Sequence, residues 1–393
     1  MSGEVRATSL VTRLVVVVFL QWVGATSVLP LLPLYLRGKG ASAATIGAVM
    51  AAYFVGSVVF QYVAGHVADR VGRRPVLVGG LFAYAAACLG FLLPLAPLAY
   101  GVLRFVQGGA AGAVEVATLA TVALVVPAGE RGSASSRIYA AQFGGAAFGP
   151  WLGAFIGVHD MAYIFIFAAT AATVAAIPVL RRDLGGPAPL REDAPLPPLS
   201  IDARLVGAVC VAVAYGLVIG AYESCWTLLM QVKGASSFQL GLSWTLFALP
   251  YVLFFRIGGW AADRYNRRWL AVVGTVNSAV FCAVYPALAV DALLALSCFE
   301  AVGTSLALPA AQSVLTEGAD PRAVGRRQGV FAASQTGALA ISAAVAGALF
   351  EVGPAVPFVA MAIASVAIVS VVPLAWRRVP GRVASSEAVT PPR

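Results

Sequence analysis

Charged side chains are scarce in this chain. They make up 11% of its 393 residues, whereas apolar side chains make up 60%. A soluble domain carries about 25% charged residues, so this chain has too few polar side chains to cover a water-facing surface. The composition excludes a soluble globular protein and indicates an integral membrane protein.

The residues that most often build metal centres and catalytic sites are also few. Only two histidines occur, His66 and His159, and both are expected in loops. The five cysteines lie within apolar runs and lack the close pairing of metal sites, so they are interpreted as small packing residues. The sequence contains no Walker motif and no Ser-His-Asp arrangement. We therefore expect no metal, no cofactor and no enzymatic activity.

The chain instead contains many long apolar runs. A membrane-spanning helix needs about 20 residues, and twelve runs are suitable. We expect spans at residues 12–34, 44–64, 76–96, 98–125, 134–157, 161–180, 205–226, 239–257, 269–289, 292–315, 328–350 and 355–376. The first run is interpreted as a retained span rather than a cleaved signal peptide.

One long connection divides these spans six and six. Residues 181–204 are rich in proline and charge, as a polar linker is. We therefore predict an all-helical membrane fold of two pseudo-symmetric six-helix halves, residues 1–180 and 205–376. The linker 181–204 is expected in the cytoplasm, and residues 377–393 are expected to form a disordered cytoplasmic tail.

The basic residues predict the orientation. If the N-terminus is cytoplasmic, 21 of the 26 Lys and Arg residues fall in segments on that side, and only Arg37, Lys39 and Lys233 fall on the other. Cytoplasmic loops of membrane proteins carry such an excess. We therefore expect both termini in the cytoplasm and the protein in the inner (cytoplasmic) membrane. This topology also accounts for the net charge of +9 without a nucleic-acid partner.

A short polar segment between the second and third spans occurs twice. The first copy contains Gly65, Asp69, Arg70, Gly72, Arg73 and Arg74, and the second contains Gly259, Asp263, Arg264, Asn266, Arg267 and Arg268. Asp69 and Asp263 are 194 residues apart, close to half of the chain. The repeat indicates two related halves of like orientation, a plan found in transporters that rock one half against the other.

The first copy resembles the signature between spans 2 and 3 of the major facilitator superfamily, and the resemblance covers nearly the whole chain. It implies alternating access, with these residues as a cytoplasmic gate that forms when the inner side closes. We expect tight turns at Gly65 and Gly72, and Asp69 bound to helix-end amides or to an arginine. The alternative is that the arginines only mark topology.

Two further segments resemble motifs of the superfamily's antiporter branches, among them the drug:proton antiporters with twelve spans. One is Pro30-Leu31-Leu32-Pro33-Leu34-Tyr35-Leu36, although this chain has Gln21 where many relatives carry an acid nine residues before the first proline. The other contains Gly145, Gly149, Pro150 and Gly153, and resembles the motif that marks exporters. Pro150 is expected to bend its helix, and the glycines to allow close packing. An ordinary packing face of small residues is the alternative.

Four ionisable residues within spans are candidates for proton coupling. Arg104 begins a segment, Arg104-Phe105-Val106-Gln107-Gly108, that is similar to a motif of proton-coupled members. A charge inside a span is costly and marks a functional candidate, unless Arg104 extends to the outer surface. Glu115, Glu223 and Glu300 are the deep carboxylates. Burial disfavours their charged form, so binding and release of a proton become possible. A carboxylate held by neighbouring helices is the alternative.

The spans that usually line the cavity in this superfamily suggest a set of substrate contacts. The candidates are Gln21, Trp22, Gln142, Tyr222, Trp226 and Phe299. Aromatic side chains there suit a flat or amphipathic substrate, although packing or a position at the membrane interface would place them equally well.

We therefore predict a monomeric secondary transporter that exports small organic molecules, drug-like or amphipathic, by proton antiport. A proton on Glu115 or on a partner carboxylate would compete with the substrate. The alternatives are a sugar or metabolite exporter, an importer, and a membrane sensor that transports nothing.

Overall fold

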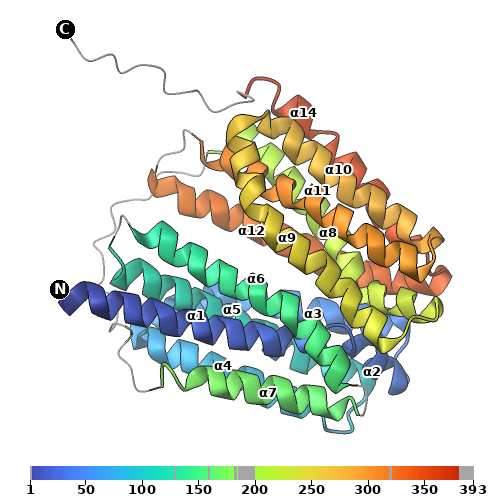
Figure 1. Cartoon of the computed structure of the whole chain (residues 1–393), viewed down its shortest axis with the longest axis horizontal. Helices are drawn as coiled ribbons and strands as arrows, with labels where there is room; N and C mark the ends of the chain where they lie inside the picture. Colours follow the sequence, from blue (N-terminus) through green and yellow to red (C-terminus); the bar gives the residue numbers. More distant parts are fainter. Residues whose placement is uncertain are drawn as a thin grey trace.

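The computed structural model describes residues 2–127, 130–157, 160–180, 184, 200–317 and 321–379. Every element in these ranges is a helix (Figure 1). The α-helices are α1 (Ser2–Val28), α2 (Leu32–Gly38), α3 (Ala43–Val71), α4 (Arg73–Gly90), α5 (Tyr100–Val125), α6 (Arg131–Ile156), α7 (Ala162–Ala176), α8 (Ala203–Val232), α9 (Ser237–Arg264), α10 (Arg267–Val284), α11 (Val290–Thr316), α12 (Pro321–Val352), α13 (Val356–Val369) and α14 (Val372–Ala375). Short 3₁₀ turns, η1 (Pro97–Ala99) and η3 (Tyr285–Ala287), precede α5 and follow α10.

Each predicted span overlaps a main helix, and the first and last spans also overlap the short helices α2 and α14. Not every main helix is long and apolar enough to count as a span by itself. Nine candidate spans meet that criterion within the described ranges, and Ala162–Ala176 is a shorter apolar helix. The fold is therefore the predicted all-helical membrane fold. The number of twelve crossings stays a prediction.

The helices pack in the same pattern twice. In the first half α1 packs on α6 and α7, α3 on α5, and α4 on α5 and α7. In the second half α8 packs on α12 and α13, α9 on α11, and α10 on α11 and α13. The repeated packing agrees with the repeated sequence segment. The predicted linker 181–204 is described only at residue 184 and from 200 onward, and the predicted tail only up to 379, so their boundaries stay predictions.

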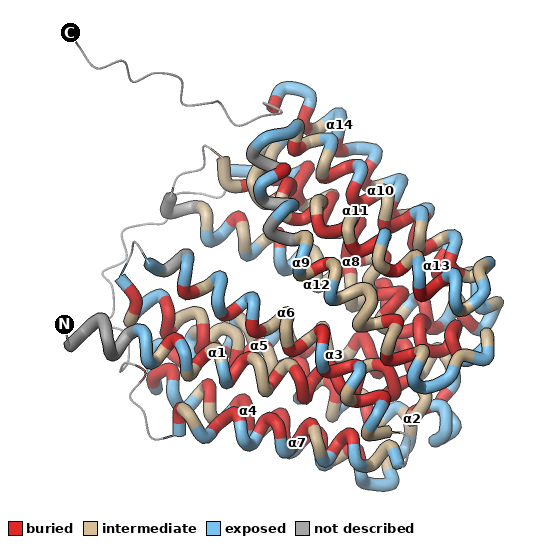
Figure 2. The backbone as a smooth tube through the Cα atoms, viewed as in Figure 1, coloured by how far each residue is buried: buried red, intermediate tan, exposed pale blue. Residues whose placement is uncertain are grey.

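The two halves meet at one end and diverge toward the end that carries the N-terminus (Figure 1). The main contacts between them are α3 with α12 and α6 with α9. A cluster of buried apolar residues spans both halves at the closed end, and a further cluster lies inside each half. Figure 2 shows the buried residues concentrated in these places. In the predicted orientation the closed end faces outward and the other end faces the cytoplasm.

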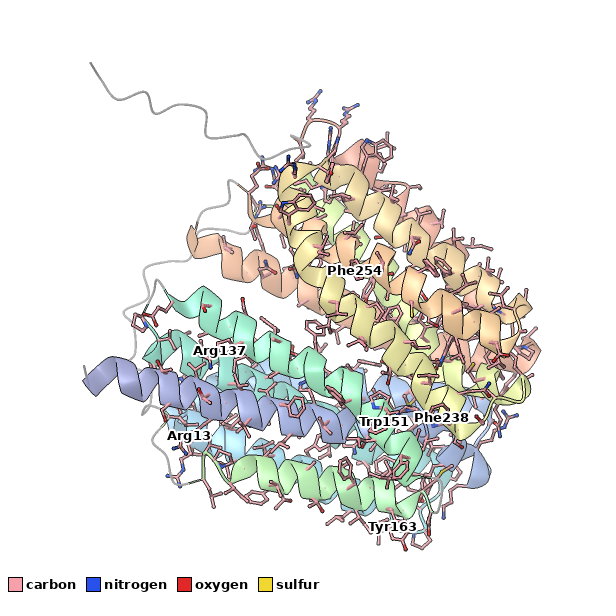
Figure 3. All side chains as sticks on the ribbon, viewed as in Figure 1. Arg13, Arg137, Trp151, Tyr163, Phe238 and Phe254 are labelled. Atoms are coloured by element: carbon pink, nitrogen blue, oxygen red, sulfur yellow. The ribbon has the colours of Figure 1, made fainter. Side chains whose placement is uncertain are left out.

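Small residues and hydrogen bonds join the halves at the closed end. A Cβ added to Gly47 on α3 would lie 2.5 Å from the carbonyl oxygen of Ala343 on α12. Thr227 on α8 donates to the carbonyl oxygen of Pro30 at 2.8 Å. Figure 3 shows the labelled aromatic residues Trp151, Tyr163 and Phe238 toward this end, and Arg13 and Arg137 toward the opposite one. The two ends therefore differ in both packing and chemistry.

The segment predicted as a loop at 65–74 is mostly helical. α3 continues to Val71, so the turn expected at Gly65 is wrong. Gly72 alone breaks the helix, with φ of 91°, a value that favours glycine. In the second copy Tyr265 and Asn266 separate α9 from α10, and the Asn266 side chain accepts from the backbone N–H of Arg268 at 3.2 Å. Hydropathy marks the apolar part of a helix, and these helices extend beyond it.

The end of the first predicted span also differs. α1 ends at Val28, and a separate short helix, α2, begins at Leu32. Pro30 lies in this break and Pro33 lies in the first turn of α2. Neither proline has the N–H that a continuous helix would need.

Candidate functional site

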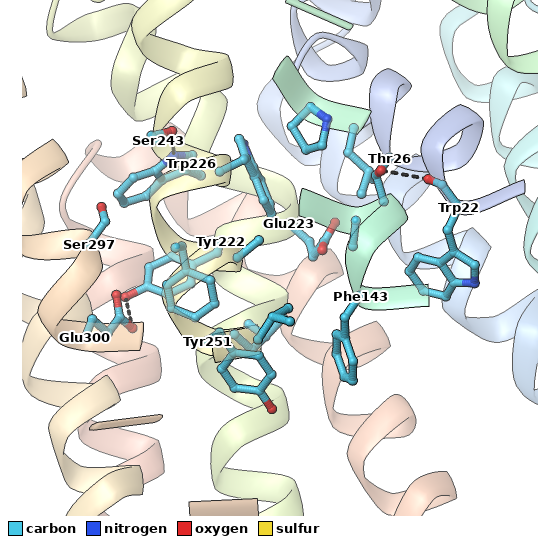
Figure 4. Close-up of a pocket in the computed structure, with 18 of the residues that line it drawn as sticks. Trp22, Thr26, Phe143, Tyr222, Glu223, Trp226, Ser243, Tyr251, Ser297 and Glu300 are labelled. Atoms are coloured by element: carbon cyan, nitrogen blue, oxygen red, sulfur yellow. Dashed lines mark hydrogen bonds between the residues drawn. The ribbon is translucent and has the colours of Figure 1, made fainter. Parts of the chain in front are cut away.

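A cavity of about 220 Å³ lies between the halves. Its walls come from α1 and α6 of the first half and from α8, α9 and α11 of the second (Figure 4). A cavity with walls from both halves changes shape when the halves move, as a transport site must.

Aromatic side chains form a large part of its wall. Trp22, Tyr222 and Trp226, which the sequence suggested, line the cavity. Tyr222 and Trp226 meet edge to face with ring centroids 5.3 Å apart. Five further aromatic residues also line it and were not predicted from the sequence: Phe143, Tyr215, Trp244, Phe247 and Tyr251. A spacing of three and then four residues places the three aromatic residues of α9 on one helix face, and this signal was available.

Glu300 lies in this cavity and is held by three hydroxyl groups. Its Oε1 accepts from Tyr222 at 3.1 Å and from Ser278 at 2.9 Å, and its Oε2 accepts from Tyr285 at 2.7 Å. The residue is 1% exposed. Hydrogen bonds of this kind stabilise a negative charge, so Glu300 has the arrangement of a carboxylate held by neighbouring helices.

Glu223 also lines the cavity but has fewer partners. Its Oε2 is buried and has no hydrogen-bond partner among the described residues. A buried polar atom without a partner is rare and calls for an explanation; here a proton or a bound molecule could supply the missing bond.

Arg104 is fully enclosed. It is 1% exposed, so its side chain does not extend to the surface. One guanidinium nitrogen donates to Gln107 Oε1 at 3.1 Å, and the group lies 4.4 Å from the ring centroid of Tyr53. Its Nε and Nη2 have no hydrogen-bond partner in the described part of the chain. Arg104 and Glu223 thus each keep unused hydrogen-bonding capacity, on opposite sides of the interface between the halves.

Glu115 lies apart from these residues, in a small second cavity inside the first half. Gln21, Trp22 and Gln142 line this cavity with it. Gln61 donates to its Oε2 at 3.3 Å. The structure thus divides the predicted substrate contacts between two cavities, with Trp22 in both. Phe299 is 66% exposed and is not among the residues that line either one.

The glycines of α6 set its distance from α1. Added Cβ atoms would lie 2.8 Å from the carbonyl oxygen of Phe19 at Gly145 and 2.7 Å from that of Val23 at Gly149, and one at Gly153 would collide with Ser27. Pro150 lies within α6 and lines the main cavity.

Ala154, the residue that follows this motif on α6, lies close to α9 of the second half. A Cβ on Gly241 of α9 would lie 2.5 Å from the Cβ of Ala154. The missing side chain of Gly241 therefore allows α9 to approach α6 closely at Ala154.

The predicted gating residues have different surroundings in the two halves. Asp69 and Arg70 are exposed, Arg73 is buried, and Arg74 donates to the carbonyl oxygen of Leu180. In the second copy Arg267 pairs with Glu317 at 2.5 Å, Arg268 donates to the carbonyl oxygen of Trp376 at 2.7 Å, and Arg264 lies 5.7 Å from the ring centroid of Trp260. The side chain of Asp263 lies outside the described residues.

Two acids that were not predicted from the sequence form salt bridges with arginines of the second half and of the segment before it. Glu317 also pairs with Arg204 at 3.5 Å, and Asp202 pairs with Arg327. Burial alone would raise the pKa of Asp202, but hydrogen bonds from Arg327 and from the Leu205 N–H leave it below its usual value. The ionic contacts found in the described ranges therefore lie in the second half, near the predicted cytoplasmic end.

Known proteins share this sequence pattern and fold. A sequence model of the Major Facilitator Superfamily matches residues 14–226 and 204–392. The tetracycline resistance protein, class E, of Escherichia coli is 35% identical over 162 residues, which cover 39% of this chain and 38% of that protein. Multidrug resistance protein 2 of Bacillus subtilis is 28% identical over 160 residues, 41% of this chain and 40% of that protein. The chain thus spans about two fifths of the length of these relatives.

Among solved structures, a D-xylose-proton symporter superposes with a TM-score of 0.76 at 16% identity, over 96% of this chain and 98% of that one. At this identity the likeness shows the fold alone. The all-helical fold predicted from the sequence is confirmed.

Proposed function

The chain belongs to the major facilitator superfamily and is a multi-pass membrane transporter rather than an enzyme, and we propose that it exports small, flat, amphipathic molecules in exchange for protons. One observation carries this proposal. The cavity between the halves has an aromatic wall and contains two carboxylates, Glu223 and Glu300. Ligand pockets with mainly apolar walls and a few polar groups suit drug-sized organic molecules.

The composition of the wall favours a drug-like molecule over a sugar. A sugar presents many hydroxyl groups, and each needs a hydrogen-bond partner when buried. Trp22, Phe143, Trp244 and Phe247 offer mainly apolar surface in this cavity. Relatives named for tetracycline and multidrug resistance support the same choice.

We assign the proton to Glu223. This carboxylate lines the cavity and has an unpartnered oxygen, so it can accept a proton from water that enters the cavity. Protonation and substrate binding then compete at one place, which is the requirement for antiport. Glu300, held by three hydroxyl groups, serves to keep Tyr222 in position.

We infer the conformational cycle and the direction from the two copies of the polar segment and from α6. The halves rock between the form described here, joined at the closed end, and one that is closed at the cytoplasmic end. Asp69 and the arginines of both copies form the cytoplasmic gate of that second form. The glycines and proline of α6 support export by their likeness to the exporter motif. The protein acts as a monomer in the cytoplasmic membrane with both termini in the cytoplasm.

Transport into inverted membrane vesicles tests this proposal. Vesicles from a host without its own efflux pumps, energised to acidify their interior, are expected to accumulate planar aromatic fluorophores, and an uncoupler is expected to abolish the accumulation. Accumulation that the uncoupler leaves unchanged would contradict proton antiport. Uptake into intact cells rather than into inverted vesicles would show an importer. Absence of any substrate-dependent proton flux over a broad panel of compounds would favour a membrane sensor.

A further inference from the structure

The second cavity, inside the first half, has room for one small group. It lies between α1, α5 and α6 and has a volume of about 10 Å³. A water molecule needs about 10–15 Å³ of such space. The cavity therefore fits a group the size of a water molecule and excludes a bulkier one.

A buried hydroxyl group in its wall has no partner. Thr118 is 0% exposed, and its Oγ1 makes no hydrogen bond to any described residue. Thr121, one turn further along the same helix, is equally buried, but its hydroxyl donates to the carbonyl oxygen of Ala117 at 2.7 Å. A buried hydroxyl without a partner is costly, so an occupant of the cavity would satisfy Thr118.

The residues that line the cavity favour an occupant with a positive charge. Glu115 supplies a carboxylate, and Gln21, Tyr139 and Gln142 add amide and phenol oxygens. No lysine or arginine is among the described residues that line the cavity. A primary ammonium group carries three N–H donors and one positive charge, and it is close to water in size. It matches both the volume and the acceptors.

Trp22 lies between this cavity and the larger one, because it lines both. Figure 4 shows it on the α1 side of the main cavity, across from Tyr222 and Glu300. In the site proposed below, the aromatic body of the molecule lies in the main cavity and its amine lies on the Glu115 side of Trp22.

We propose that this cavity is the head-group site for a primary ammonium group of the transported molecule, with Glu115 as its counter-ion and Thr118 as a hydrogen-bond acceptor. The proposal rests on the proposed function and adds the substrate class, aromatic primary amines. The trimethylammonium form of the same amine carries the same charge but is too large to enter.

Equilibrium binding to the full chain in nanodiscs, without a proton gradient, tests this site separately from transport. Three probes share one aromatic body: 2-(1-naphthyl)ethylamine, its N,N,N-trimethyl derivative and 2-(1-naphthyl)ethanol. Isothermal titration calorimetry is expected to show the primary amine binding about tenfold or more tightly than either analogue, the range of a buried hydrogen bond to a charged group. Glu115→Gln is expected to remove this preference and to leave the Kd of the alcohol unchanged.

Two threonine variants keep the test specific. Thr118→Val is expected to weaken binding of the amine severalfold without changing that of the alcohol. Thr121→Val, the matched control, is expected to leave the affinities of all three probes unchanged, since its hydroxyl is already bonded within the helix.

Equal affinity for the primary amine and its trimethyl derivative would overturn the head-group site while leaving the aromatic cavity and the proposed export intact. The same holds if either Glu115→Gln or Thr118→Val keeps the full preference for the amine. If none of the three probes binds, the aromatic cavity itself is contradicted, and the head-group site falls with it.

Discussion

Arg104 and Glu223 lie in opposite halves of the chain, and each keeps a buried polar atom without a hydrogen-bond partner among the described residues. Unused donors and an unused acceptor at a moving interface are expected where one of the groups changes its protonation state during function.

Glu223→Gln is expected to abolish proton-driven transport. Glutamine has a similar shape but cannot take up a proton, so efflux should fall at least tenfold to the rate seen with an uncoupler. The measurement is fluorophore accumulation in energised inverted vesicles, compared with counterflow exchange in the absence of a gradient.

Exchange should persist in Glu223→Gln, because it needs only alternating access. Asp291→Asn, which removes a carboxylate in the first turn of α11 instead, serves as the control and should keep its response to the gradient. Efflux by Glu223→Gln that still responds to the gradient would remove this residue from proton coupling.

Gly153→Ala is expected to destabilise the first half. An added methyl group would collide with the carbonyl oxygen of Ser27 on α1. Overpacking of this kind costs about 1–3 kcal/mol, and the expected result is a lower melting temperature in detergent. Gly144→Ala is the matched control on the same helix, because its methyl group would meet only the Phe19 ring at 3.5 Å. Equal melting temperatures for the two variants would show that α6 can move away from α1 at little cost.

Asp202→Asn is expected to lower stability at neutral pH but not in acid. The pKa of Asp202 is below its usual value, so its stabilising contribution is fully present above pH ~4 and is lost as the pH falls through the lower, folded-state pKa. Asparagine can still cap α8, so the variant removes the charge opposite Arg327 alone. The expected loss is about 1 kcal/mol or less, because the Asp202 side chain is 42% exposed and solvent screens the pair.

Melting curves of Asp202→Asn and of the unmodified chain, recorded from pH 7 downward, give the comparison. The difference between the two should shrink below pH ~4. A difference independent of pH would indicate that capping, rather than charge, is what the aspartate provides. Asp291→Asn, on the first turn of α11, controls for the loss of one negative charge elsewhere.

The fold could be predicted because the membrane imposes long apolar runs, and because a repeated segment indicates two halves. Gly72 could be located from the sequence, since a short polar break between two helices needs a residue that tolerates positive φ. Gly65 could not be placed correctly, because a helix that continues beyond the bilayer loses its hydropathy signal but not its backbone hydrogen bonds.

The candidate site was only partly predictable. Trp22 and Tyr222 line the main cavity, whereas Phe299 does not: it precedes Glu300 by one residue, and one residue turns the side chain by about 100° around the helix. The partners of Glu317 and Asp202 come from helices far apart in the sequence, and no local pattern indicates them. The division into two cavities depends on how α1 and α6 pack, which a single sequence does not specify.

Gly347→Val is expected to shift the protein toward a form that is open at the end that is closed in this structure. Gly347 on α12 packs directly on α3 where the halves meet, and an added Cβ would collide with the carbonyl oxygen of Ala43. A branched side chain at Gly347 opposes the α3–α12 contact that joins the halves at the closed end. A form that is open at that end lacks this contact and can accept the side chain. Cysteine labelling with a membrane-impermeant reagent, at a position near Trp226 in a background without native cysteines, should increase in whole cells by severalfold. Gly337→Val on the same helix should leave labelling unchanged, because no atom lies within 4 Å of its added Cβ. Labelling that stays low in Gly347→Val, in protein that folds and inserts normally, would show that the α3–α12 contact does not control opening at this end.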